Sequence, residues 1–305
     1  MLTPPTRWLS IVVCTRNRAA SLTRTLESLG ALAVPDGCTA ELVVVDNGST
    51  DGTADVVERF ARSTTMRVRY AYEATPGVAR ARNRGLHEAA GEIIAFTDDD
   101  CLVDCGWLQQ LVAELDADAH TVMVFGRTRM AVSTQPALSV KDDDERRLYE
   151  YPTPPWVIGH GNNMAMRRAL VDEVGSFDEG MGAGTRVGSG SDTEYVFRIL
   201  RRGHRILYSP GAVVWHDLSR YTAEDAQRVW DAYARGRGAF YIMHTIRGDR
   251  WAAKMLAREL LRKARAIVAG ANRRRAWRDL VGLLAGVAYR LRGELRPRGH
   301  RPAAH

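Results

Sequence analysis

The feature that most constrains the fold is a regular alternation between short apolar runs and helical patterns, which begins near residue 9. The apolar runs are rich in β-branched side chains and occupy residues 9–14, 41–46, 67–72 and 93–97. Between the first two runs, Leu22, Leu26 and Leu29 recur at the spacing of one helix face. Such alternation is typical of βαβ units. It predicts an α/β fold with a mostly parallel sheet flanked by helices.

Polar residues follow these runs where the strands would end. They are Thr15 with Arg16, Asp46, and the triplet Asp98 to Asp100. Ligands of open α/β sheets bind outside the carboxyl ends of the strands. We therefore expect one pocket to collect all three groups.

The composition is that of an ordinary globular protein. The chain has 305 residues, of which 45% are hydrophobic and 26% charged. This length allows one large domain with an appendage, or two modest domains. Four cysteines are too few for a disulfide framework and favour a reducing compartment. The first residues lack the parts of a secretory signal and no apolar run has the length of a membrane span, so a cytoplasmic location is expected.

Three adjacent carboxylates, Asp98 to Asp100, would repel one another without compensation. A divalent cation compensates them, and Mg²⁺ and Mn²⁺ both prefer oxygen ligands. Asp98 and Asp100 therefore form a candidate metal site at a strand end. The alternatives are a solvated acidic turn and a group of acids at the start of the next helix.

The segment VVVDNGSTDGT places Asp46 directly before a cluster of small turn residues. Small residues let a ligand approach the backbone, and the Asp46 carboxylate can accept hydrogen bonds from a nucleobase or a ribose hydroxyl. An Asx turn is the structural alternative. No GxxxxGK motif occurs, and no GxGxxG motif follows the first strand. Phosphates would therefore be neutralised by the metal and by arginines such as Arg82.

Six segments together resemble a glycosyltransferase of family 2 over roughly residues 9–217. They are LSIVVCTRNR, VVVDNGSTDGT, PGVARARNRGLHEAAGEIIAFTDDDCLVDCGWL, GNNMAMRRALVDEVGSFDE, GSDTEYVFRI and VVWH. The resemblance implies a GT-A fold. It also implies that a sugar is transferred with inversion from a nucleotide-diphosphate sugar, held over Mg²⁺ or Mn²⁺, to an acceptor hydroxyl. UDP-, GDP- and dTDP-sugars remain open as donors, and a glycan, a lipid-linked sugar or a small molecule as acceptor.

The resemblance also assigns residues to the donor and metal sites. The donor site comprises Thr15, Arg16, Asp46, Arg82, Asn83, Asp98 and Asp99. Within it, Asp46 matches the acid that contacts the nucleoside. Asp98 and Asp100 match the metal motif. His216 matches a histidine that approaches the metal or the diphosphate in some relatives, although an ordinary strand-end histidine is an equal alternative.

Asp192 matches the catalytic base, which removes the proton of the attacking hydroxyl. Its structural alternative is an acid in the first turn of a helix. Trp156, Asn162 and Asn163 lie where relatives build the wall between donor sugar and acceptor, and Trp156 is equally compatible with a core position.

The chain departs from the family pattern at two positions. Ser191 stands where the family usually has Glu, which puts contacts with the acceptor in doubt, and Cys101 replaces an acid that often follows the metal motif.

Residues 133–155 lose periodicity and predict a long loop, a candidate lid over the site.

Charge divides the chain near residue 220. Residues 221–305 hold 19 Lys and Arg against 7 Asp and Glu, and residues 1–220 hold 24 against 29. We expect a catalytic domain over 1–220, with a nucleotide-sugar part to about 130 and an acceptor part over 131–220. A basic helical extension would follow over 221–305.

The basic extension has several candidate partners. Basic amphipathic segments bind anionic membrane surfaces, which predicts a peripheral location at the inner face of a membrane. A helical extension that packs on the catalytic domain or on a second subunit, as in a homodimer, is the structural alternative. Nucleic acid is disfavoured because no binding motif accompanies the charge. Two functions therefore compete with the transferase: a non-catalytic nucleotide-sugar-binding module and an adaptor that acts through the extension.

Overall fold

The computed structural model describes residues 7–132, 138–218, 222–270 and 272–294. The chain separates into two compact units. Unit 1 comprises residues 1–179 and 191–223, and unit 2 comprises residues 180–190 and 224–305. The two units are described separately below.

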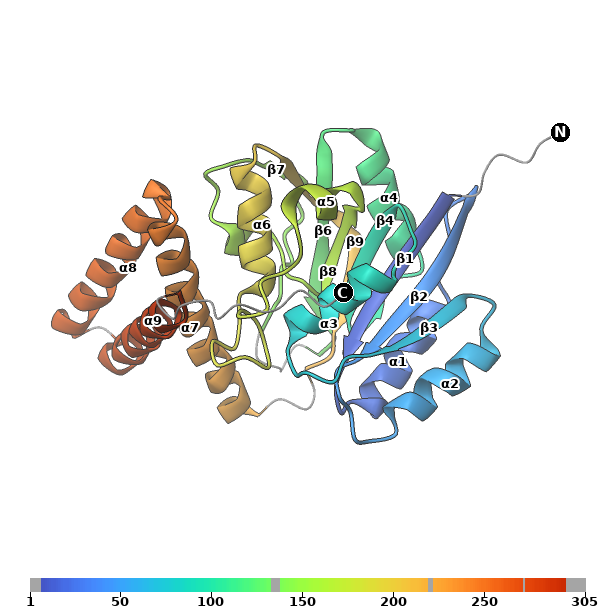
Figure 1. Ribbon diagram of the computed structural model, residues 1–305, viewed down its shortest axis with the longest axis horizontal. Helices are drawn as coiled ribbons and strands as arrows, with labels where there is room; N and C mark the ends of the chain where they lie inside the picture. Colours follow the sequence, from blue (N-terminus) through green and yellow to red (C-terminus); the bar gives the residue numbers. More distant parts are fainter. Residues whose placement is uncertain (1–6, 133–137, 219–221, 271, 295–305) are drawn as a thin grey trace, which may run out of the picture. The chain divides into compact units, whose positions relative to one another are not determined.

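Unit 1 is built on one sheet (Figure 1). Its strands are β1 (Arg7–Thr15), β2 (Cys38–Asp46), β3 (Arg67–Tyr72), β4 (Ile93–Asp98), β5 (Cys101–Val103), β6 (Thr121–Met130), β7 (Arg147–Tyr149), β8 (Asn163–Arg167) and β9 (Arg205–His216). The strand order is β3-β2-β1-β4-β8-β6-β9-β5, and β7 also pairs with β9. Most of these strands run in one direction, whereas β8, β5 and β7 oppose them.

Helices cover both faces of this sheet (Figure 1). They are α1 (Ala19–Gly30), α2 (Thr53–Ser63), α3 (Val78–Glu88), α4 (Trp107–Ala117), α5 (Ala169–Val174) and α6 (Ser191–Arg201), with a short 3₁₀ helix η1 (Pro155–Val157). The core is split accordingly. Leu9, Ile11 and Val13 of β1 pack in the cluster of α1, α2 and α4, whereas Val12 packs in the cluster of α3, α5 and α6. A strand buried on both faces is apolar at nearly every position, which explains the near-continuous run in β1; buried Ser10 is an exception and donates a hydrogen bond to Glu41.

The strand register brings the polar motifs together. Thr15 at the end of β1 is the register partner of Asp46 at the end of β2, and Cys14 is the partner of Asp98 at the end of β4. Because these strands are parallel neighbours, their carboxyl ends meet at one edge of the sheet. The predicted convergence of the three groups is confirmed at the level of the backbone.

Unit 2 contains three long helices, α7 (Ala223–Ile246), α8 (Arg250–Val268) and α9 (Arg273–Glu294). The Asp249 carboxylate caps α8 by accepting a hydrogen bond of 2.7 Å from the Ala252 amide. The helical character predicted for the extension is confirmed. Among the helices of the described residues, none has an apolar stretch long enough to cross a membrane.

The predicted long loop over residues 133–155 is partly wrong. Residues 133–137 lie outside the described part of the chain. Further on, Lys141 forms an isolated bridge with Thr128, and β7 adds an antiparallel partner to β9. Neither pairing leaves a periodic pattern, because a strand of three residues is too short to show one.

Candidate active site

Asp46 is buried at the end of β2, and both of its carboxylate oxygens accept hydrogen bonds. Its side chain accepts a hydrogen bond of 2.7 Å from the Ser49 amide and another of 2.7 Å from the Tyr70 hydroxyl. The next residue, Asn47, donates to the carbonyl oxygens of Glu73 and Thr75. The loop after β2 is thus tied to the chain after β3, and Asp46 is held as an acceptor at the sheet edge.

The loop after β1 contributes an arginine that the sequence analysis did not single out. Arg18 Nη1 lies 2.6 Å from an oxygen of Asp99 and 2.8 Å from an oxygen of Asp100. Thr15 is buried and Arg16 is exposed. Burial raises the pKa of Asp99, and the positive charge of Arg18 opposes this rise. Arg18 therefore neutralises part of the negative charge of the acidic triplet.

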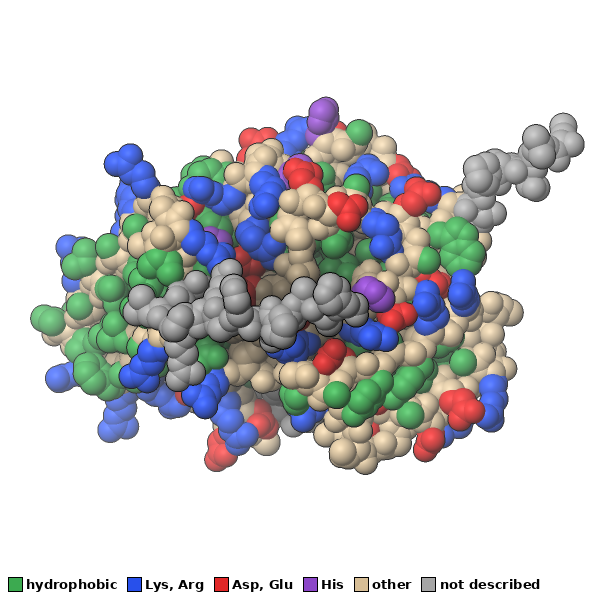
Figure 2. Space-filling model, in the orientation of Figure 1, with side chains coloured by type: hydrophobic (Ala, Val, Ile, Leu, Met, Phe, Trp, Pro, Cys, Tyr) green, Lys and Arg blue, Asp and Glu red, His purple; other side chains and the backbone are tan. Residues whose placement is uncertain are grey.

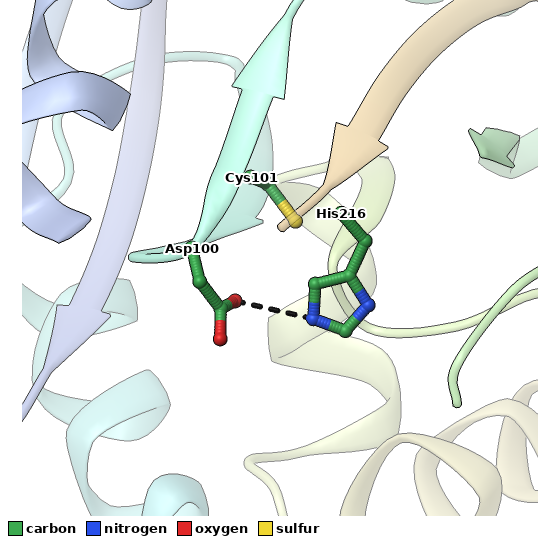
Figure 3. A group of neighbouring side chains, drawn as sticks. All are labelled: Asp100, Cys101 and His216. Carbon is green, nitrogen blue, oxygen red and sulfur yellow. Dashed lines mark ion pairs between the residues drawn. The ribbon is translucent and has the colours of Figure 1, made fainter. Parts of the chain in front are cut away.

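Three side chains at the junction of β5 and β9 could hold a metal ion (Figure 3). Asp100, Cys101 and His216 offer ligand atoms that all lie within 4.8 Å of one another. His216 Nε2 points toward Asp100 and lies 3.2 Å from Oδ1. The pairing of β5 with β9 fixes this arrangement, because Cys101 and His216 are register partners.

Asp100 and His216 together offer oxygen and nitrogen ligand atoms that fit a divalent cation. His216 Nδ1 lies 3.2 Å from the Leu138 carbonyl oxygen, which assigns the proton to Nδ1 and leaves Nε2 to face Asp100. Carboxylate ligands suit both Mn²⁺ and Mg²⁺. Burial raises the pKa of the Cys101 thiol well above its ordinary value, so the thiol stays protonated and is a poor ligand.

Arg82 connects the metal-motif side of the site with Asp192. Its Nη2 lies 3.8 Å from Asp98 Oδ1, and its Nη1 donates a 3.0 Å hydrogen bond to the Ser191 hydroxyl. The Arg82 side chain is 7% exposed, whereas that of Asp98 is 36% exposed. Gly161 makes this position available, since a Cβ there would lie 2.3 Å from Arg82 Nη2. The buried Arg82 guanidinium therefore interacts electrostatically with two carboxylates, that of Asp98 at the end of β4 and that of Asp192 at the start of α6.

The surroundings of Asp192 favour the ionised form of its side chain. It lies in the first turn of α6, and its carboxylate accepts hydrogen bonds of 2.9 Å from the amides of Gly161 and Thr193. Burial acts to raise its pKa, but the charge of Arg82, that of His160 once it is protonated at acidic pH, and the two amides outweigh burial and hold the pKa below its ordinary value. The carboxylate is a proton acceptor at neutral pH.

His160 is a second residue that the sequence analysis missed. Burial lowers its pKa, and its Nε2 lies 3.3 Å from the Val140 carbonyl oxygen. A neutral ring that donates from Nε2 keeps its Nδ1 as an acceptor. No motif marks this histidine, which is recognisable only from its place beside Asp192.

The residues predicted to form the acceptor wall differ in their surroundings. Trp156 is half-buried in η1, which packs on α6. Asn162 is buried, and its side-chain oxygen accepts a hydrogen bond from the Thr128 hydroxyl. The Asn163 amide donates to the carbonyl oxygens of Arg127 and Ala212 and accepts from Trp107 Nε1. Asn163 begins β8 as the register partner of Thr97, but these three bonds hold its side-chain amide inside the core.

Asn83 likewise serves the backbone. Its side-chain amide donates to the Phe177 carbonyl oxygen at 3.0 Å and accepts from the Phe177 amide at 2.8 Å. This pair fastens α3 to the chain before α6. The structure therefore brings Asp98, Arg82 and Asp192 into one site, whereas Asn83 and Asn163 have their polar atoms engaged elsewhere.

The fold and site place the chain among nucleotide-sugar transferase folds, and a family model agrees. The model described as glycosyl transferase family 2 matches residues 10–175, more than half of the chain. The chain belongs to this family. A curated relative, "Probable glycosyltransferase YdaM" of Bacillus subtilis, is 24% identical over 239 residues, which cover 75% of this chain and 53% of the relative. The chain thus spans about half the length of that relative.

Two solved structures are similar in fold. The mannosyltransferase PcManGT of Pyrobaculum calidifontis, in complex with GDP-Man and Mn²⁺, has a TM-score of 0.63 and 22% identity. The match covers 93% of this chain and 86% of that one. S. aureus TarS 1–349 in complex with UDP-GlcNAc has a TM-score of 0.60 and 19% identity, and the match covers 77% of this chain and 65% of that one. These likenesses confirm the predicted GT-A fold.

Proposed function

We propose that this chain transfers a sugar, with inversion and assisted by a divalent metal, from a nucleotide-diphosphate sugar to an acceptor hydroxyl. The observation that carries the proposal is the ionised Asp192 carboxylate in the same site as the acidic triplet, with Arg82 between them. The family assignment and the nucleotide sugars bound by the two structural neighbours support it.

In this mechanism Asp192 is the general base. The acceptor oxygen attacks the anomeric carbon and forms the new glycosidic bond while Asp192 takes its proton. The bond between the anomeric carbon and the diphosphate oxygen breaks on the opposite face, and the nucleoside diphosphate leaves with the electron pair. The low pKa of Asp192 keeps the carboxylate ionised, so that it needs no prior deprotonation.

Asp100 and His216, whose ligand atoms lie together in the structure, would hold the metal ion with Asp98, the further ligand that the family resemblance assigns. When bound, the cation would supply positive charge to the leaving diphosphate. Arg18 and Arg82 add fixed positive charge on either side of the triplet, through Asp99 and Asp100 in one case and Asp98 in the other. Asp46, at the neighbouring strand end, would accept a hydrogen bond from the nucleoside.

The first test of the proposal is calorimetric binding of UDP, GDP, dTDP and CDP, with Mn²⁺, with Mg²⁺, and with EDTA. We expect one nucleotide to bind only in the presence of a metal. No binding of any of the four to a folded sample would contradict the proposal. The preferred nucleotide then directs an acceptor screen with a glycan, a lipid-linked sugar and a small-molecule alcohol.

The second test separates catalysis from binding. Asp192→Asn should retain metal-dependent nucleotide binding and lose transfer by at least about a hundredfold, the lower end of the usual contribution of a general base. Asp172→Asn is the matched control, because Asp172 is an exposed acid of α5 outside the site. Unchanged turnover in Asp192→Asn would remove this residue from the mechanism. Nucleotide binding without transfer to any acceptor would favour a binding module instead.

A further inference from the structure

Helix α9 of unit 2 packs on α7 through a face made of small residues. A Cβ at Gly286 would lie 2.0 Å from the Arg235 carbonyl oxygen, and one at Gly282 would lie 2.8 Å from the Ala234 Cβ. On α7, a Cβ at Gly238 would lie 2.0 Å from the Leu283 carbonyl oxygen. The two backbones are therefore in close contact, and this face of α9 is fully used inside the unit.

The opposite face of α9 is apolar and exposed. Trp277, Val281 and Leu284 follow one another at positions i, i+4 and i+7 and are 58%, 49% and 47% exposed. Ala288 continues the line at i+11 and is exposed as well. At about 100° per residue, this line lies opposite Gly282 and Gly286. We call these four residues the α9 apolar stripe.

Arginines flank the α9 apolar stripe at both ends. Arg273 and Arg274 precede Trp277 by four and three positions, and Arg292 follows Ala288 by four. All three side chains are exposed, and none forms an ion pair with a residue that the structure describes. Figure 2 shows hydrophobic and basic side chains gathered side by side over the region of α8 and α9.

We propose that the α9 apolar stripe docks unit 2 on the surface of an anionic lipid bilayer. An interfacial helix needs an apolar face to enter the boundary between head groups and acyl chains, and cations beside it to meet lipid phosphates. Trp277, Val281 and Leu284 supply the apolar face. The long arginine side chains can lie along the helix while their guanidinium groups reach the head groups. The docking is independent of the transfer chemistry, because it concerns unit 2 alone.

Charge favours a lipid surface over a second copy of the chain. Residues 221–305 hold 19 basic and 7 acidic residues. A symmetric contact through this face would bring the flanking arginines of two copies together, whether the two α9 helices run parallel or antiparallel, and such like charges repel. Nucleic acid would match the charge but would leave Val281 and Leu284 exposed to water. An anionic bilayer satisfies both the arginines and the apolar side chains.

The test is sedimentation of the full chain with vesicles. Vesicles of equal parts phosphatidylglycerol and phosphatidylcholine should bind the protein, whereas pure phosphatidylcholine should bind it at least about tenfold more weakly, because each arginine near an anionic surface contributes on the order of 1 kcal/mol. The triple variant Trp277→Ser, Val281→Ser, Leu284→Ser should bind the mixed vesicles at least about tenfold more weakly. Arg273→Gln with Arg274→Gln should reduce the preference for phosphatidylglycerol.

Two controls protect this test. Leu148→Ser removes an exposed apolar side chain of comparable exposure, 44%, from unit 1, and it should bind like the unchanged chain. Circular dichroism should show each variant folded, which is expected because the altered side chains are exposed. As a second readout, brominated lipids should quench tryptophan fluorescence less in Trp277→Phe, because Trp277 would be the residue at the lipid boundary.

Three results would overturn the proposal. The first is equal vesicle binding by the triple variant and the unchanged chain. The second is self-association in analytical ultracentrifugation that the triple variant abolishes, without vesicle binding, which would identify a second copy as the occupant. The third is binding of a homopolymeric RNA in preference to the mixed vesicles, with no dependence on the α9 apolar stripe.

Discussion

Replacing Arg82 by methionine tests how the site keeps its base ionised. Methionine retains much of the apolar volume and removes the charge. The guanidinium of Arg82 is 3.8 Å from Asp98 and is the foremost of the groups that lower the pKa of Asp192. A nearby opposite charge lowers the pKa of a carboxyl group by about 1 to 3 units. With desolvation by burial then less opposed, the pKa of Asp192 should rise above its value in the unchanged chain.

The sign of the effect on rate follows from the role of the base. In the proposed mechanism transfer requires the ionised carboxylate, so activity should fall as the pH drops through the pKa of Asp192. In the unchanged chain this pKa is low, and the acid limb of the pH–rate profile lies at low pH. In Arg82→Met the limb should move upward by at least about 1 pH unit, the lower end of the shift that an opposite charge produces. The assay is release of nucleoside diphosphate at saturating donor, across the pH range in which the protein stays folded.

Two matched variants isolate the charge. Ser191→Ala removes the hydrogen bond that Arg82 donates but keeps the guanidinium, and it should leave the limb nearly in place. Arg80→Met removes a cation of the same helix that pairs with Glu179 at 2.8 Å, and it should not move the limb. If Arg82 serves only to bind donor phosphate, KM for the donor will rise in Arg82→Met while the acid limb stays fixed. That result would refute the reasoning.

Three further outcomes are expected. Asn163→Ala should lower the free energy of unfolding by roughly 3 to 5 kcal/mol, because Trp107 Nε1 and two backbone carbonyls lose a buried partner. Urea unfolding measures this, and a stable variant with a raised KM would argue for direct sugar contact. Gly161→Ala should cut turnover more than nucleotide binding, because the new Cβ displaces Arg82 from beside Asp192; equal losses in both assays would contradict this. His216→Gln should weaken Mn²⁺ binding by about tenfold or more, as judged by calorimetry with metal alone, and an unchanged affinity would exclude His216 as a ligand.

The first half of the fold was predictable because its strands are buried on both faces. Such strands are apolar at nearly every position, so β1, β2 and β4 are recognisable in the sequence as nearly continuous apolar runs. Each run ends at the polar residue that the register then places at the sheet edge. Sequence order and the rule for ligand sites in α/β sheets were sufficient to predict this edge.

Short edge strands were not predictable. Strands β5 and β7 have three residues each, too few for a periodic pattern. The first half of β9 has no clear strand pattern either, because RILYSPG ends in turn-forming residues that suggest a break. These elements are stabilised by pairing with distant parts of the chain, and no local signal records that pairing.

Side-chain orientation limited the prediction of the site. Asn83, Asn162 and Asn163 look alike in sequence as polar residues near a motif, yet the amides of Asn83 and Asn163 are occupied by backbone groups and Trp107. Arg16 and Arg18 follow β1 two residues apart, and only Arg18 turns toward the acidic triplet. Which of two neighbouring arginines faces inward depends on where α1 begins, one residue after Arg18.

The pairing of β5 with β9 has a consequence for how unit 1 would acquire the proposed metal ion. Asp100 and His216 are more than a hundred residues apart in the chain and meet only when β9 has joined the sheet beside β6 and β5. A chain still emerging from the ribosome before residue 216 would lack the histidine ligand, and an unfolded chain would hold its ligands far apart. Metal binding should therefore stabilise the completed sheet selectively, and raise its unfolding temperature with metal concentration. The ion would thus bind late in folding and stabilise β9 in its place in the sheet.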